Sequence, residues 1–111
     1  MTTPLRVTFR DMDRSAALES FARAWYDKLE HVSTGIDHCD VVFERPHQHQ
    51  HSNQPFHVRV SLASGEILVS VDATHVGAYV AIRDAFRAAR RQLQDQIRRQ
   101  RRDVKQHSLP H

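Results

Sequence analysis

The stretch 56-FHVRVSLASGEILVSVD-72 decides the fold class of this chain. Apolar and polar residues alternate on both sides of Ser64-Gly65, which is typical of strands that bury one face. A Ser-Gly pair between two strands is a turn signal, so the segment predicts an antiparallel hairpin. A sheet with one apolar face needs a second layer to cover that face, and the rest of the chain must supply it.

The flanking segments predict two more strands and two helices. Residues 5–10 and 36–45 alternate apolar and polar side chains and are interpreted as strands. Between them, apolar residues repeat at helical spacing, so we expect a helix from an Asp13 cap to about Glu30. A long helix is expected over about 76–104. The predicted order is β-α-β-β-β-α, an α+β fold in which a four-stranded sheet has two helices packed on one face.

Length and composition limit the function classes. The 111 residues suit one domain, expected over 1–107 with a tail over 108–111. Cys39 is the only cysteine and is expected to be a small buried residue, with no disulfide or CxxC metal site. No signal peptide or membrane-spanning run is visible, and these absences favour the cytoplasm. No GxSxG, Walker or HExxH motif is present, so we expect no enzyme, no cofactor and no small-molecule substrate.

Basic residues are concentrated in the last third of the chain. Residues 1–77 carry seven Lys/Arg and ten Asp/Glu, whereas residues 78–111 carry nine and three. On a wheel of about 100° per residue, the long helix separates into two arcs. The apolar arc contains Ile82, Ala85, Phe86, Ala89, Leu93 and Ile97. The basic arc contains Arg83, Arg87, Arg90, Arg91, Arg98, Arg101 and Lys105, and the acids Asp84, Asp95 and Asp103 lie outside it.

A row of like charges on one helix face indicates an anionic partner. Like charges at i,i+4 spacing repel each other, and a bound polyanion relieves that repulsion. The planar guanidinium fork donates two parallel hydrogen bonds to a phosphate, so nucleic acid is the favoured partner. The alternative is a solvated face that has no partner.

Three short motifs, in this order of elements, carry a resemblance to a known family. They are Lys28-Leu29-Glu30, Gly65-Glu66-Ile67, and Tyr79-Val80-Ala81-Ile82 leading to Arg91-Gln92-Leu93. Over about residues 5–107 the chain resembles the ribosome hibernation-promoting factor and ribosome-associated inhibitor family. It would be a short form of that family, because it stops after the second helix. Three positions depart from the usual family residues: Val32, Arg83 and Ala88.

The resemblance implies a function as well as a fold. Family members bind the small ribosomal subunit in the channel for messenger and transfer RNA, and block translation in stationary or stressed cells. By this resemblance we expect a ribosomal RNA-binding inhibitor that acts sterically. The residues expected to contact RNA are Lys28, Arg83, Arg87, Arg90, Arg91, Arg98, Arg101 and Arg102.

Weaker signals leave alternatives open. In an extended loop, His47, His49 and His51 point to one side and could bind a metal, although a polar loop or an RNA contact fits the same residues. The chain could instead be a protein-interaction or oligomerisation module; we expect a monomer, or a weak oligomer, when it is free. Phe21 and Trp25 are expected to pack in the core rather than to form a stacking platform for bases. Tyr79 is expected to be partly in the core. A ribonuclease using His57 or His75 is a further alternative.

Overall fold

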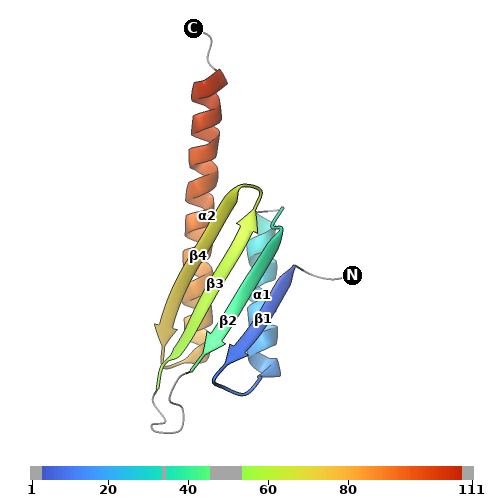
Figure 1. Cartoon of the computed structure of the whole chain (residues 1–111), viewed down its shortest axis with the longest axis vertical. Helices are drawn as coiled ribbons and strands as arrows, with labels where there is room; N and C mark the ends of the chain where they lie inside the picture. Colours follow the sequence, from blue (N-terminus) through green and yellow to red (C-terminus); the bar gives the residue numbers. More distant parts are fainter. Residues whose placement is uncertain (1–3, 34, 46–53, 109–111) are drawn as a thin grey trace.

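The computed structural model describes residues 4–33, 35–45 and 54–108, with side chains as far as residue 102. A four-stranded sheet has both helices on one of its faces (Figure 1). The fold class and the order β-α-β-β-β-α are therefore confirmed. The elements are β1 (Leu5–Arg10), α1 (Ala16–Val32), β2 (His38–Glu44), β3 (Phe56–Ser64), β4 (Ile67–His75) and α2 (Ala78–Ser108).

The strands lie in sequence order across the sheet. β1 and β2 are parallel and are joined by α1, while β2, β3 and β4 form an antiparallel meander. The β3–β4 turn closes at Gly65, whose φ of 61° lies in the left-handed region that favours glycine. The backbone N–H of Gly65 donates to Asp37 Oδ2 at 2.9 Å, which ties this turn to the start of β2.

The helix boundaries differ from the prediction in two places. Asp13 is not the cap of α1: the Ser15 hydroxyl accepts a hydrogen bond from the N–H of Leu18 at 3.2 Å, so the cap lies two residues later than predicted. At the second helix, the N–H of Gly77 donates to His75 Nδ1 at 2.8 Å. With this contact the chain turns before α2, which begins at Ala78 rather than at about residue 76. At its other end α2 continues to Ser108, past the expected end near residue 104.

The core lies between the inner face of the sheet and the two helices. Alternation places Cys39, Val41 and Phe43 of β2 in it, fully buried as predicted. In α1 the most deeply buried aromatic ring is that of Tyr26, which is 2% exposed. Its hydroxyl donates to Glu30 Oε2 at 3.0 Å, and burial together with that acidic neighbour raises the pKa of Tyr26. The other buried core residues include Leu18, Ala22, Leu29, Val58, Val60, Leu62, Ile67, Val69, Val71, Ile82, Phe86 and Leu93.

Burial of Cys39 predicts a loss of stability at alkaline pH. Burial, and to a lesser extent Asp40, raises the pKa of the thiol from 9.0 to about 12. The unfolded chain therefore loses this proton at lower pH than the folded protein. The contribution of the thiol to the free energy of unfolding is constant below about pH 9 and falls by about 1.4 kcal/mol per pH unit between about pH 9 and 12.

Urea unfolding at pH 8 and pH 10 measures this effect. Cys39→Ala is the matched control, because it keeps Tyr26 and every other group that titrates in this range. Between the two pH values, the free energy of unfolding of the unaltered protein should fall by about 1.4 kcal/mol more than that of the variant. Equal losses in both proteins would show that the thiol does not titrate differently on folding.

Candidate nucleic-acid interface

The arcs predicted for α2 are present in the structure. Ile82, Phe86 and Leu93 are buried against the sheet, whereas Arg87 and Arg90 are exposed. A period of 3.6 residues per turn places the two sets on different sides of one rigid helix, and the core fixes which side faces solvent. We call the predicted contact residues the basic surface: Lys28, Arg83, Arg87, Arg90, Arg91, Arg98, Arg101 and Arg102. All are exposed except Arg83, which is half-buried.

Two arginines of the basic surface are partly neutralised within their own helix. Arg83 Nη2 lies 3.1 Å from Asp84 Oδ1, and Arg98 forms an ion pair with Asp95. The wheel places these acids outside the basic arc, but long arginine side chains reach across it. These two ion pairs lower the net charge of the basic arc below what the helix wheel alone indicates.

The middle of α2 keeps its full positive charge. Among the described side chains, no carboxylate forms an ion pair with Arg87, Arg90 or Arg91. These three residues lie within about one turn of each other, so their repulsion is not relieved inside the protein. This segment is the part of the basic surface best suited to bind an anion.

A groove between α1 and α2 brings Lys28 to this segment. The groove has a volume of about 240 Å³ and is lined by Trp25, Lys28, Leu29, Phe86, Arg87 and Arg90. Lys28 Nζ lies 4.7 Å from the centre of the Trp25 ring, and Arg87 Cζ lies 6.0 Å from it. The indole therefore holds cations from both helices around one site.

Trp25 and Phe21 lie at the margin of the core rather than inside it. Both side chains are half-buried, and Phe21 makes an edge-to-face contact with Tyr79 at 4.7 Å between ring centres. Tyr79 is 48% exposed, more than the partly core position expected from the sequence. The sequence prediction placed Trp25 in the core and missed the groove. The groove forms only where α2 packs beside α1 and supplies the opposite wall, which the pattern of α1 alone does not show.

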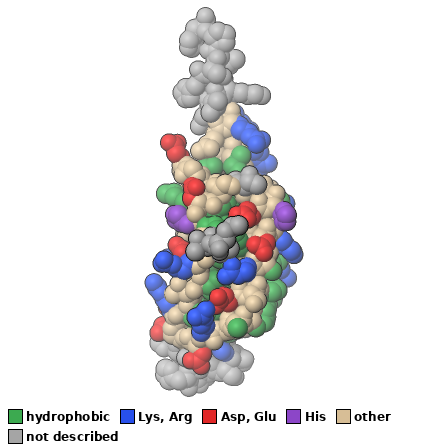
Figure 2. Space-filling view, turned by 90° about the vertical axis from the view of Figure 1, so that its right-hand side faces the viewer, with side chains coloured by type: hydrophobic (Ala, Val, Ile, Leu, Met, Phe, Trp, Pro, Cys, Tyr) green, Lys and Arg blue, Asp and Glu red, His purple; other side chains and the backbone are tan. Residues whose placement is uncertain are grey.

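The C-terminal part of α2 extends past the end of the sheet (Figure 1). Gln96 Nε2 donates to the carbonyl oxygen of Leu68 at 3.0 Å, which holds the helix against β4. Beyond this contact Arg98, Arg101 and Arg102 are exposed, as is Arg99, which the sequence analysis did not include. Figure 2 shows blue side chains beside the last described residues of α2, whereas acidic and basic side chains intermingle over the body below.

A comparison with protein families identifies the chain. The profile of the family described as "Sigma 54 modulation protein / S30EA ribosomal protein" matches residues 5–101. The chain belongs to this family. Membership confirms the resemblance to the hibernation-promoting factors and indicates a ribosome-associated protein from a group that is not a known enzyme family. A comparison with curated protein sequences found no significant match.

Solved structures share the fold of this S30EA family protein. One is a ribosomal subunit interface protein from Coxiella burnetii, with a TM-score of 0.70 and 13% identity over 82% of this chain and 93% of the other. Another is the N-terminal domain of Protein Y from Thermus thermophilus, with a TM-score of 0.66 and 16% identity over 78% of this chain and 89% of the other. At these identities the likeness concerns the fold.

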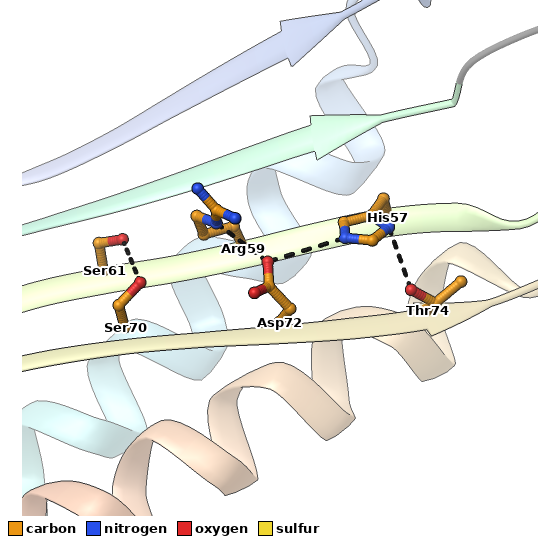
Figure 3. Close-up of polar contacts among 6 residues, drawn as sticks. All are labelled: His57, Arg59, Ser61, Ser70, Asp72 and Thr74. Carbon is orange, nitrogen blue, oxygen red and sulfur yellow. Dashed lines mark hydrogen bonds and ion pairs between the residues drawn. The ribbon is translucent and has the colours of Figure 1, made fainter.

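The outer face of the sheet of this S30EA family protein carries a polar cluster from β3 and β4 (Figure 3). His57 Nδ1 lies 3.1 Å from Thr74 Oγ1, within hydrogen-bond distance. Asp72 Oδ1 lies 3.7 Å from His57 Nε2 and accepts its hydrogen bond from Arg59 Nε, at 2.9 Å. That hydrogen bond raises the pKa of Arg59. His75 accepts from Gly77 in the turn before α2. Both histidines considered for catalysis thus make contacts that stabilise the sheet and its turn.

The remaining predictions concern metals and membranes. His47, His49 and His51 lie outside the described residues, so a metal site there stays a prediction. Within residues 4–33, 35–45 and 54–102, no three His, Cys, Asp or Glu side chains are grouped as metal ligands. In the same part of this S30EA family protein, neither helix has an apolar stretch long enough to cross a bilayer.

Proposed function

We propose that this S30EA family protein binds ribosomal RNA of the small subunit through the basic surface and blocks the channel for messenger and transfer RNA. The observation that carries the proposal is the positive segment Arg87, Arg90 and Arg91, which lies opposite Lys28 and has no acidic partner among the described residues. Phosphates supply the missing negative charge and accept the guanidinium hydrogen bonds.

The shape of the protein fits this role. α2 has 31 residues and is therefore about 46 Å long, and its apolar side is fixed to the sheet. Its arginines keep a set spacing along that rod and can follow the phosphates of a folded RNA. Recognition then depends on RNA shape more than on base sequence, as is typical for structured RNA.

Inhibition on this proposal is steric and needs no reaction. A folded domain that occupies the channel excludes the transfer and messenger RNA that would bind there. Such a factor acts in the cytoplasm, where it would silence ribosomes during stress or stationary phase. Nothing in this role requires a cofactor.

Self-association through the projecting end of α2 is less favoured. That end exposes Arg98, Arg99 and Arg102, so a second copy laid against it would bring like charges together. We therefore expect the free protein to be a monomer.

Co-sedimentation with purified ribosomal subunits tests the proposed function. At low salt the protein should pellet with small subunits, and added messenger RNA together with transfer RNA should displace it. Large subunits provide the matched control for non-specific RNA binding. Equal binding to both subunits, or binding that transfer and messenger RNA do not reduce, would contradict the proposed location.

A further inference from the structure

We infer that the groove between α1 and α2 binds one unpaired nucleobase, which stacks on Trp25 while the adjoining phosphates contact Arg87 and Arg90. This site rests on the proposed function, because it needs an RNA bound along the basic surface. It adds a base-recognition site to a surface so far assigned only to phosphates.

The composition of the groove matches a nucleotide. Trp25, Leu29 and Phe86 provide an apolar and aromatic wall, and Lys28, Arg87 and Arg90 provide three cations. Its lining, taken from the described part of the chain, includes no carboxylate. A planar aromatic ligand that also carries negative charge satisfies both halves of this lining.

The position of Trp25 on its helix supports a binding role. The adjacent Tyr26 is 2% exposed, whereas Trp25 stays half-buried although its ring is larger. The indole thus borders solvent at the place where cations of two helices meet. Stacking on such a ring tolerates any base, because every base has a flat face.

The size of the groove favours a single base. Its volume of about 240 Å³ is below the roughly 300–1,000 Å³ typical of sites for drug-sized ligands. A base inside a duplex is stacked on both faces by its neighbours and has no free face for the indole, so the interior of duplex RNA does not fit. The phosphates of a free nucleotide stay close to its base, whereas the phosphates of a strand extend along α2 and can also contact the exposed Arg91. A strand is therefore the better ligand.

Lys28 must move for the base to enter. Its ammonium group lies over the Trp25 ring, in the place that a base stacked on that face would take. The lysine side chain is flexible and exposed, so it can swing to a phosphate of the incoming strand. Base and lysine therefore exchange places on the indole.

Fluorescence reports on this site directly, because Trp25 is the only tryptophan of the chain. The probes are a single-stranded oligoadenylate, an abasic ribose-phosphate strand of equal length, and a duplex of that length. Binding of each is followed independently by anisotropy of a label on the strand. All three should bind at low salt, and only the oligoadenylate should quench Trp25.

Variants separate stacking from phosphate binding. Trp25→Leu should weaken oligoadenylate binding about five- to hundred-fold and leave the abasic strand unaffected. Trp25→Phe, which keeps an aromatic face, should restore most of the loss. Tyr79→Leu is the matched control, because it removes an exposed aromatic ring that does not line the groove. Quenching in the unaltered protein decides the question even if Trp25→Leu fails to fold.

The outcomes distinguish this site from the proposed function. If small subunits and all strands bind, but oligoadenylate leaves Trp25 fluorescence unchanged, the stacking site is wrong and the phosphate surface stands. Equal quenching by the abasic strand would also overturn the site, since it would report only the movement of Lys28. If neither subunits nor any strand bind at low salt, the proposed function itself fails.

Discussion

Arg87→Glu/Arg91→Glu protein is expected to bind small ribosomal subunits about 10²- to 10⁴-fold more weakly than the unaltered protein. Each arginine lost removes a hydrogen bond between charged groups, which contributes about 1.5–3 kcal/mol. A tenfold change in affinity corresponds to about 1.4 kcal/mol. Both side chains are exposed, so the substitutions should leave the core intact. Co-sedimentation across a series of subunit concentrations measures the loss.

Arg6→Glu/Arg10→Glu is the matched control for this variant. It changes the net charge by the same amount, but both residues are exposed on β1, where Leu5, Val7 and Phe9 face the core. Alternation places these two arginines on the outer face of the sheet, away from the helices. We expect this control variant to lose only a little affinity for small subunits, through long-range electrostatics. An equal loss in both variants would show that overall charge, rather than the basic surface, governs binding.

The main features of the fold are predictable from periodicity. Alternation over residues 56–72 predicts β3 and β4, because inward and outward positions of a strand differ in burial. The two arcs of α2 follow from the same reasoning at helical spacing. The order of strands does not follow from local patterns. The parallel pairing of β1 with β2 depends on α1 crossing over the sheet, which brings Leu5 opposite Cys39.

The candidate site was predictable in its charges but not in its contacts. Sequence identifies every arginine of α2, yet the ion pair of Arg83 with Asp84 depends on side-chain conformation. In α1 the apolar positions form one broad arc, and the packing of α2 and the sheet decides where its buried centre lies. That packing buries Tyr26 and leaves Trp25 at the groove.

Affinity for the small subunit is expected to fall on the order of 10³-fold between 50 and 200 mM monovalent salt. Each neutralised phosphate releases counterions and contributes about −0.7 to −0.9 to the slope of log affinity against log salt. Within the described side chains, six cations of the basic surface have no acidic partner: Lys28, Arg87, Arg90, Arg91, Arg101 and Arg102. If all six contact phosphates, the slope lies between about −4 and −5.5.

The ion pairs inside α2 allow this slope to be changed without touching a basic residue. Asp84→Asn/Asp95→Asn removes the acidic partners of Arg83 and Arg98 and makes both available to phosphates. The slope should steepen by about 1.5, and binding at low salt should tighten. Arg87→Glu/Arg91→Glu should instead make the slope shallower, because two phosphate contacts are lost. A slope near −1 in the unaltered protein would contradict a phosphate-binding surface. An unchanged slope in the Asp84→Asn/Asp95→Asn variant would restrict that surface to the middle of the helix.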